Sequence, residues 1–498
     1  MQLRTEGLCA LLLSAATGAS PSTLVLRVLD ERGQPAAARV LVVDPGGQPQ
    51  RIEAADAPPL VPAHPNFPEL GVIVRDRRSL ELPSGRLTMR IDRGTEYRRV
   101  QIALDGDRGQ QTVRLERWID MAAKGWWSGD LHVHRAATDL PALLDAADLH
   151  FAPALTGWND STTAAASPPY NYEDERHWGA ALFLNAKSPI RLYAREAEYP
   201  PPYATWSEAR SHGAFIDLEK LIWWEAPVIA ALIPPDSIGV AVNHFREDGV
   251  SVRASLARPR DEIRYPGERG FAGYILDLYS HYLSAGFRIP ASAGSANGVA
   301  KNAIGYNRSY VYLGKKYSYD NWLAGQKAGR NFVTNGPMLL VRVNGDLPGA
   351  VLPAGVRQAR VDVNAISAGH LERAEILVDG VVARTLKPSD PASGIHATST
   401  VSVEDGSWLA VRCFEKNDAT VRLAHTSPVY FGESPRRSRE SLAYLRDWVH
   451  AEMERVRAVP EAKLSAAQKE EFLAFCRKAL RFYDEYGSRP QASGGQVQ

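Results

Sequence analysis

The hydrophobic pattern of this chain changes twice along its length, and these changes limit the folds that it can adopt. Residues 23–115 contain short alternating apolar runs separated by turn sequences such as Pro45-Gly46-Gly47, a pattern typical of antiparallel strands. From Trp118 to Asn335, strand-like runs alternate with helix-like stretches, which is typical of an α/β domain. A second β-rich region extends from Met338 to Phe431. At 498 residues the chain is also too long for a single hydrophobic core.

The pattern predicts a multidomain α/β plus all-β protein. We expect a β-sandwich-like domain over residues 21–117, an α/β barrel over 118–336 and a second β-sandwich-like domain over 337–432. A helical segment should follow over 433–498, because the tail lacks glycine from Ser438 to Tyr486 and carries two stripes of apolar residues. Two amphipathic helices divided near Pro460 are the expected result.

Residues 1–20 have the layout of a secretory signal peptide. Arg4 stands in a short polar start, the apolar run Leu8–Ala16 follows, and small residues surround Ala19. We predict cleavage close to Pro21 and a secreted or periplasmic protein, with a retained cytoplasmic leader as the alternative. No other segment approaches the roughly 18 apolar residues that cross a bilayer, so we expect no membrane span.

Composition excludes some partners. The chain has 58 Lys and Arg against 57 Asp and Glu, a formal net charge of +1, so no overall field attracts nucleic acid. Of the cysteines Cys9, Cys413 and Cys476, the first would leave with the signal peptide and the others fall in different expected domains. A disulfide framework is therefore not predicted. The expected partner is a small-molecule or carbohydrate-derived substrate, and the sequence leaves the oligomeric state open.

The run Gly129-Asp130-Leu131-His132-Val133-His134-Arg135 is the strongest functional signal. Residues i and i+2 of a strand point to the same face, so His132 and His134 would present two imidazoles side by side. Imidazole is a ligand for zinc, manganese and iron. We predict half of a divalent-metal site here, zinc being the first choice and manganese or iron the alternatives.

Several other expected strands also end in polar groups. In an α/β barrel the C-terminal strand ends form the active face. We expect strand ends at the following positions: His134, Trp158, Glu198, Glu219, His244 and near Ser295.

The motif Trp127–Arg135 resembles the first motif of the PHP (polymerase and histidinol phosphatase) metallohydrolases, in particular the CehA/McbA family. The resemblance extends to four further stretches: Asn243-His244, Arg288–Ser295, Gly305–Arg308 and Asn331–Pro337. It implies a distorted seven-stranded α/β barrel, metal at the C-terminal strand ends, and hydrolysis of phosphate or other esters. It also implies that Glu198 corresponds to a strand glutamate of the family, with Glu196 on the same face as the fallback.

The chain departs from the PHP pattern in three places. A Thr-Asp-His turn is replaced by Thr156-Gly157-Trp158-Asn159, a His-Pro pair by Asp217-Leu218-Glu219-Lys220, and an Asp after Ser295 by Ala296-Asn297. These departures argue against a trinuclear site.

A smaller metal site remains, with ligands from His132, His134, His244 and a carboxylate of Glu198 or Glu219. Taken alone, each carboxylate is equally well explained as a solvated surface charge. Three or four such ligands with an open position fit one catalytic ion.

Two further residues have expected roles in catalysis. Asp130 would orient a ligand imidazole or its loop. Lys220 would act as an acid or as a clamp for an anion, unless it forms a plain ion pair with Glu219 or Glu225. Five tryptophans near these motifs form either a substrate platform or core: Trp126, Trp127, Trp158, Trp223 and Trp224.

Together these features predict a metal-dependent hydrolase in which a metal-activated water attacks an ester or phosphoester, with amide or carbohydrate-linked substrates as variants. The alternative is a degenerate, non-catalytic barrel that binds a carbohydrate or another ligand, flanked by two β modules.

Overall fold

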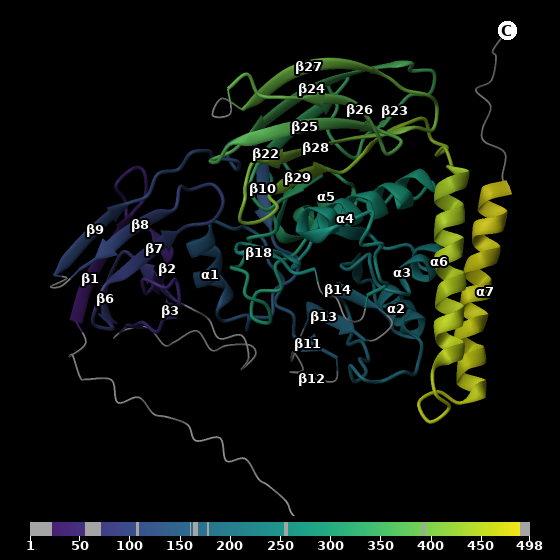
Figure 1. Cartoon of the computed structure of the whole chain (residues 1–498), viewed down its shortest axis with the longest axis horizontal. Helices are drawn as coiled ribbons and strands as arrows, with labels where there is room; N and C mark the ends of the chain where they lie inside the picture. Colours follow the sequence, from purple (N-terminus) through teal and green to yellow (C-terminus); the bar gives the residue numbers. More distant parts are fainter. Residues whose placement is uncertain are drawn as a thin grey trace, which may run out of the picture.

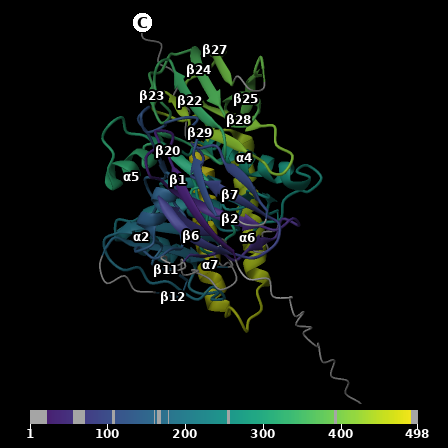
Figure 2. The same ribbon diagram turned by 90° about the vertical axis from the view of Figure 1, so that its left-hand side faces the viewer.

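The computed structural model describes residues 22–54, 71–105, 109–159, 161–162, 168–176, 179–252, 257–390 and 394–488. It is a mixed α/β protein rich in strands, with seven α-helices in these ranges. An N-terminal β region, a central α/β region and a C-terminal β region lie side by side, and a helical pair stands at one end (Figure 1; Figure 2 shows the N-terminal end). The expected signal peptide lies outside the described residues. Within them, none of the helices combines the length and apolar character that a bilayer crossing requires.

The N-terminal region consists of two sheets that share one hydrophobic core. The first sheet contains β4 (Glu53–Ala54), β6 (Arg77–Leu82), β1 (Ser22–Leu29) and β9 (Gln110–Arg114). The second contains β3 (Pro49–Gln50), β2 (Ala37–Val43), β7 (Leu87–Asp92) and β8 (Val100–Leu104), with β5 (Val72–Arg75) also on β2. The pairing of β1 with β9 is parallel, so the region is not purely antiparallel.

The central region is built on a mixed seven-stranded sheet. Its order is β12 (Ser161–Thr162), β11 (Gly157–Trp158), β13 (Tyr170–Glu175), β14 (Ala180–Ala186), β15 (Phe215–Leu218), β16 (Ser237–Ala241) and β19 (Ala291–Ala293). Strand β14 runs antiparallel to both neighbours. The described elements therefore do not show a (β/α)7 barrel.

Five helices accompany this sheet. They are α1 (Leu140–Ala147), α2 (Pro202–Ser211), α3 (Ala226–Leu232), α4 (Gly267–Ser284) and α5 (Tyr319–Lys327). A short hairpin, β17 (Phe245–Arg246) with β18 (Gly249–Val250), follows β16. The strand expected to end at Glu198 is absent. Instead, β13 and β14 provide two strands that the hydrophobic pattern did not indicate.

A nine-stranded sheet crosses the domain boundary expected at residue 336. Its main path is β10 (Trp126–Gly129), β20 (Arg308–Tyr312), β21 (Asn331–Thr334), β29 (Leu423–Thr426), β28 (Trp408–Glu415), β25 (Leu371–Val378) and β26 (Val381–Leu386), with β23 (Val351–Leu352) and β30 (Val429–Phe431) alongside. The second sheet of this region contains β22 (Met338–Val343), β24 (Gln358–Ile366) and β27 (Ile395–Ser402). One core joins both sheets, and this continuity ties the C-terminal β region to the strand that precedes the two histidines.

The tail forms two helices, α6 (Arg439–Ala458) and α7 (Ala466–Ser488), which stand side by side in Figure 1. Ser438 caps α6 by accepting a hydrogen bond from the Ser441 N–H. Both helices pack against α3, and α6 also packs against α4. The apolar side of α6, including Leu445 and Trp448, is fully buried.

Two acidic side chains are buried where the tail meets the central region. Glu225, at the start of α3, and Glu452 of α6 are 5% and 1% exposed. Burial raises the pKa of Glu225 well above its ordinary value, and the nearby Glu452 raises it further, although Arg176 opposes the shift. Burial also raises the pKa of Glu452, although Arg455 lies 3.0 Å away. A carboxyl with a raised folded pKa stabilises the fold at low pH, and this contribution is lost as the pH rises through the folded pKa.

We therefore expect Glu225→Gln to become more favourable relative to wild type as the pH rises. The unfolded chain releases the Glu225 proton near pH 4.5, whereas the buried side chain must keep it or pay for an uncompensated charge. Thermal unfolding at about pH 5.5 and about pH 8.5 should show a relative gain of about 1–3 °C at the higher pH. The exposed Glu461→Gln is the control and should show no such trend. An unchanged difference between the two pH values would contradict the expectation.

Candidate metal centre

The segment that follows β10 carries His132 and His134. Leu131 and Val133 are fully buried and point to the side opposite the two imidazoles, as alternation along an extended chain requires. Backbone hydrogen bonds fix the segment on one side: Leu131 N–H donates to Ala293 O at 3.2 Å and His134 N–H to Asn297 O at 2.8 Å. The two imidazoles are therefore held by the edge of strand β19.

Asp130 fixes the same segment through its carboxylate. One oxygen, Oδ1, accepts hydrogen bonds from the N–H groups of His132 and Ser295, both at 3.0 Å, and Oδ2 accepts one from Gly305 N–H at 2.7 Å. Close packing adds to this, because a Cβ atom on Gly294 would lie 2.5 Å from the Cβ of His132. Asp130 was expected to orient an imidazole or its loop, and the structure shows that it holds the loop. Asp130 is therefore a positioning residue for this loop.

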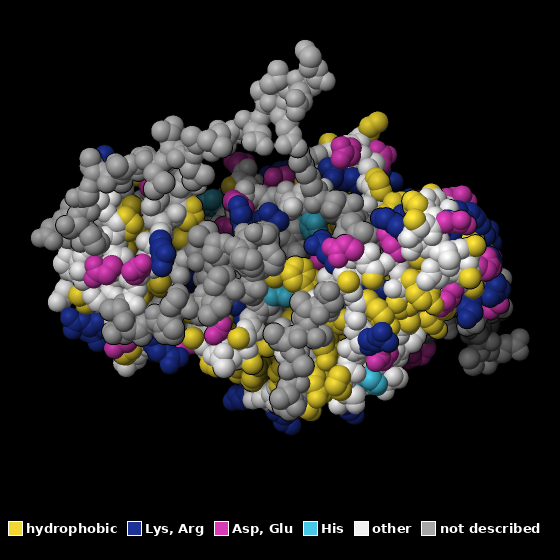
Figure 3. Space-filling model, turned by 90° about the horizontal axis from the view of Figure 1, so that it is seen from below, with side chains coloured by type: hydrophobic (Ala, Val, Ile, Leu, Met, Phe, Trp, Pro, Cys, Tyr) yellow, Lys and Arg dark blue, Asp and Glu magenta, His cyan; other side chains and the backbone are white. Residues whose placement is uncertain are grey.

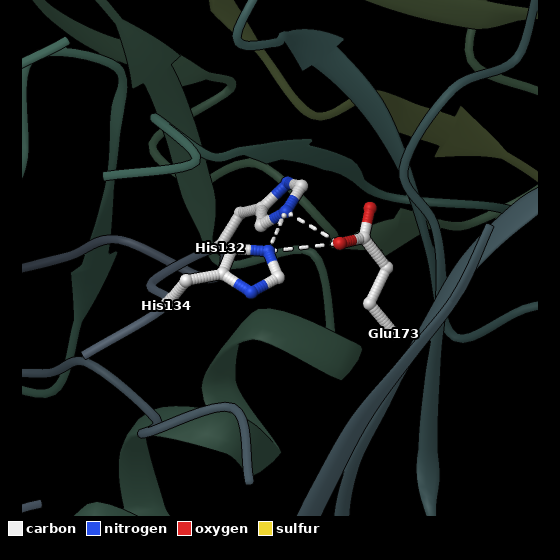
Figure 4. Close-up of side chains that lie close together, drawn as sticks. All are labelled: His132, His134 and Glu173. Atoms are coloured by element: carbon white, nitrogen blue, oxygen red, sulfur yellow. Dashed lines mark hydrogen bonds and ion pairs between the residues drawn. The ribbon is translucent and has the colours of Figure 1, made fainter. Parts of the chain in front are cut away.

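Three ligand atoms converge at this point (Figure 4). The Nε2 atoms of His132 and His134 are 2.9 Å apart. Glu173 Oε2, from β13, lies 3.2 Å from the first and 2.8 Å from the second. Two ligands on one four-coordinate ion with bonds of about 2.0–2.1 Å stand roughly 3.3 Å apart, so these spacings suit a shared ion. Among the described residues these three side chains form the group that could hold a metal.

Glu219 contacts the far side of His132. Its Oε1 lies 3.2 Å from Nδ1 of the imidazole, and its Oε2 lies 2.8 Å from the ammonium of Lys220. Close backbone packing fixes its position, since a Cβ on Gly239 would lie 1.8 Å from the Glu219 carbonyl oxygen. Neither Glu219 oxygen is aligned for a hydrogen bond within the described residues. Glu219 therefore lies beside His132 and Lys220 but outside the group of three convergent ligand residues.

The buried charges in this cluster do not balance without a cation at the histidines. The side chains of Glu173 and Glu219 are both 2% exposed, that of Glu175 is 12% exposed and that of Lys220 is 5% exposed, so the carboxylates outnumber the one ammonium. Burial disfavours a charged His132, but Glu173 and Glu219 outweigh burial and raise its pKa to about 10. Likewise Lys220 and His132 overcome burial and lower the pKa of Glu219 to about 2. A proton on His132 or a metal ion can supply the missing positive charge.

Glu173 Oε2 also has the character of a metal ligand. It is buried and, among the described residues, has no aligned hydrogen-bond donor, although two imidazole nitrogens lie within 3.2 Å of it. A buried carboxylate oxygen without a donor is costly. A divalent ion at this position removes that cost, so the residues present fit such an ion.

His244 lies at the margin of the centre. Its Nδ1–H donates to the Ser251 carbonyl oxygen at 2.6 Å, which leaves Nε2 as the basic nitrogen. Burial lowers its pKa, and the charge of Lys220 acts in the same direction. His244 is thus a neutral imidazole near Lys220, but it is not one of the three convergent residues.

Glu198 is not brought into the cluster. Its carboxylate lies 3.7 Å from Lys463, in the connection between the two tail helices. The structure supplies Glu173 instead, from the run Tyr170-Asn171-Tyr172-Glu173-Asp174-Glu175. The alternation of Tyr170 and Tyr172 was the available signal for this strand.

The five tryptophans are dispersed. The Trp158 ring is 5.1 Å from that of His134 and is the one beside the centre. Trp126 packs on Phe332 in the core of the C-terminal β region. Trp127 stacks on Tyr317, Trp223 is buried, and Trp224 lies under Arg455. The five tryptophans therefore do not form one platform.

Figure 3 shows acidic, basic and histidine side chains together near the middle of the face seen from below.

Comparison with known proteins adds no assignment: no family model, no curated protein and no solved structure matches the chain.

A matched pair of substitutions separates Glu173 from Glu198. We expect Glu173→Gln to weaken binding of Zn²⁺ at least about 100-fold, because it removes a charged ligand atom. Glu198→Gln should leave the affinity within about twofold, since its carboxylate lies outside the convergent group. Competition titration against a chromogenic chelator measures both. Equal losses in the two variants would argue against the ligand set described above.

Proposed function

We propose that this protein is a metal-dependent hydrolase that cleaves an ester or phosphoester. The observation that carries the proposal is the convergence of His132, His134 and Glu173 on one point inside a buried cluster with excess negative charge. Two imidazoles and one carboxylate are a ligand set of catalytic zinc sites, in which a further position stays open for water or substrate. Manganese or iron also suits this set of nitrogen and oxygen donors.

Different residues of the chain would have different roles in such a site. A divalent ion held there would supply an activated water at neutral pH and polarise the scissile group. The Glu219 carboxylate lies 3.2 Å from Nδ1 of the His132 ring, and Asp130 accepts a hydrogen bond from the His132 backbone N–H. Burial lowers the pKa of Lys220, but Glu219, Glu175 and Glu173 outweigh burial, raise this pKa and hold the side chain in the charged state.

This charge limits what Lys220 can do. It is a poor proton donor or acceptor at neutral pH, and its suitable role is attraction of an anionic group or a developing oxyanion. The Trp158 ring beside His134 offers an apolar surface to the organic part of a substrate.

We also propose that the central sheet closes into a distorted barrel of the PHP type. Leu131 N–H bonds Ala293 O at the β19 edge. On the other side of this segment, Val133 O accepts a hydrogen bond from Leu155 N–H. The next residue, Thr156, donates its N–H to Asn171 O of β13. These bonds support a closed ring of strands, and the HxH run supports the family resemblance. A crystal structure with an open gap between residues 129–134 and either neighbour would contradict closure.

Export of the protein is a separate proposal that rests on residues 1–20. Expression with this leader in a bacterial host that has a secretion pathway should yield a mature chain that starts close to Pro21. Intact-mass analysis of the periplasmic fraction gives the measurement. Recovery of a soluble cytosolic protein with Met1 intact contradicts it.

The hydrolase proposal is tested by metal content and turnover together. We expect the purified protein to contain close to one divalent ion per chain and to hydrolyse members of a panel of aryl esters, phosphomonoesters and phosphodiesters. A chelator should abolish turnover and Zn²⁺ or Mn²⁺ should restore it. His134→Ala should lower kcat/KM at least about 100-fold, which corresponds to about 2.7 kcal/mol of lost transition-state stabilisation.

His450→Ala, on the exposed side of α6, is the control and should retain full turnover. Absence of bound metal, or turnover that survives both the chelator and His134→Ala, overturns the hydrolase proposal. Metal binding without turnover on any class of substrate would favour the non-catalytic binding module.

A further inference from the structure

We propose that the ammonium group of Lys220 occupies the position of a second metal ion and thereby restricts the centre to one ion. This inference deepens the proposed function and rests on it for the first ion, held by His132, His134 and Glu173. It concerns the neighbouring space, where the ligands are oxygen atoms alone.

Three carboxylates surround the Lys220 ammonium. Nζ lies 2.8 Å from Glu219 Oε2, 3.3 Å from Glu173 Oε1 and 3.7 Å from Glu175 Oε1. Glu173 and Glu175 lie two residues apart on β13 and share a face of the strand, whereas Glu219 follows β15. The ligands thus come from two separate strands and converge on one buried point.

Glu173 joins the two positions. Its Oε2 faces the two imidazole nitrogens, and its Oε1 faces Lys220. A carboxylate that divides its oxygens between two cations is the arrangement of a bridging ligand in a two-metal site. In this chain the second cation is part of the protein.

The oxygen set defines which ion the position would accept. Carboxylates without imidazole or thiolate suit Mn²⁺ and Mg²⁺, so a vacated position should prefer these ions to the softer ones that suit the histidines. The ammonium carries one positive charge where a divalent ion carries two. The ammonium therefore compensates the charges of the buried carboxylates of Glu173 and Glu219 less completely than a divalent ion would. The remaining negative charge favours a cation at the imidazoles.

The backbone around Lys220 leaves little freedom for the side chain to withdraw. The residue follows Glu219, whose carbonyl oxygen lies so close to Gly239 that a Cβ atom there would be 1.8 Å away, and the next two residues, Leu221 and Ile222, are buried. Glu173 and Glu175 hold the other end. Removal of the side chain should therefore open space at a preformed set of ligands.

The test compares two substitutions that remove the same charge. Lys220→Ala removes the ammonium and opens the space, whereas Lys220→Met removes the ammonium but fills the space with a chain of similar length. Wild-type protein and both variants are loaded with Zn²⁺ and then titrated with Mn²⁺, and bound Mn²⁺ is counted by electron paramagnetic resonance and by elemental analysis. We expect no additional Mn²⁺ in the wild type or in Lys220→Met, and one additional ion per chain in Lys220→Ala.

Stability gives a second readout. Both variants should unfold at a lower temperature than the wild type, because Glu173 and Glu219 lose their partner. With Zn²⁺ already bound at the first position, Mn²⁺ should raise the unfolding temperature of Lys220→Ala and of a second cavity variant, Lys220→Ser, but not that of Lys220→Met. Cavity variants that fold neither without nor with Mn²⁺ contradict the inference.

Three further results would overturn it: a second ion in the wild type, a second ion in Lys220→Met, or folded Lys220→Ala without additional Mn²⁺. Failure of the proposed function is distinguishable. The double variant His134→Ala/Lys220→Ala should lose the Zn²⁺ of the first position and still bind Mn²⁺, so binding at the carboxylates can be shown even if the wild type holds no ion.

Discussion

A buried excess of negative charge is the constraint on which the centre depends. Glu173 and Glu219 face Lys220 and His132 in a space from which water is largely excluded. Each buried charge therefore needs an opposite charge close to it. The Lys220 ammonium compensates the charge of one of these two carboxylates. The charge of the other carboxylate is compensated at the imidazoles. Because the pair His132 and His134 faces Glu173, the position that needs positive charge is also the position with nitrogen and oxygen ligands. Electrostatics and ligand geometry thus point to the same place.

The rest of the fold holds these groups in register. His132 and His134 stand on a segment that hydrogen-bonds to β19, and their backbone depends on Asp130. The preceding strand, β10, belongs to the nine-stranded sheet that also contains β25 and β28. The C-terminal β region therefore supports the metal centre directly, and it is not an appended module that could be removed without consequence.

Sequence patterns located the parts of the fold whose signal is local. The alternating run at 359–363 lies inside β24, the stretch from Asp139 to Ala147 contains α1, and the Asp379-Gly380 turn joins β25 to β26 with positive φ at both residues. The HxH pair was also found locally, since both ligands stand on one extended segment. The carboxylate could not be found this way. Strand β13 buries Glu173 and Asp174, and an acidic run of this kind is normally the mark of a solvated loop.

Two asparagines in the stretches that differ from the PHP pattern form structural hydrogen bonds. Asn159 accepts a hydrogen bond from Glu175 N–H through Oδ1, at 2.9 Å, and so ties the end of β11 to β13. Asn297 accepts from Arg135 through Oδ1 at 2.8 Å, while its carbonyl oxygen holds His134 N–H.

Both asparagines thus use their side chains to brace segments next to the candidate ligands. In the proposal for Lys220, its ammonium group takes the place of a second metal ion. This positive charge is attached covalently to the chain and is not held by ligands. A centre reduced in this way needs fewer bound ions to reach charge balance, and it keeps its ligand geometry because the protein itself supplies the second cation.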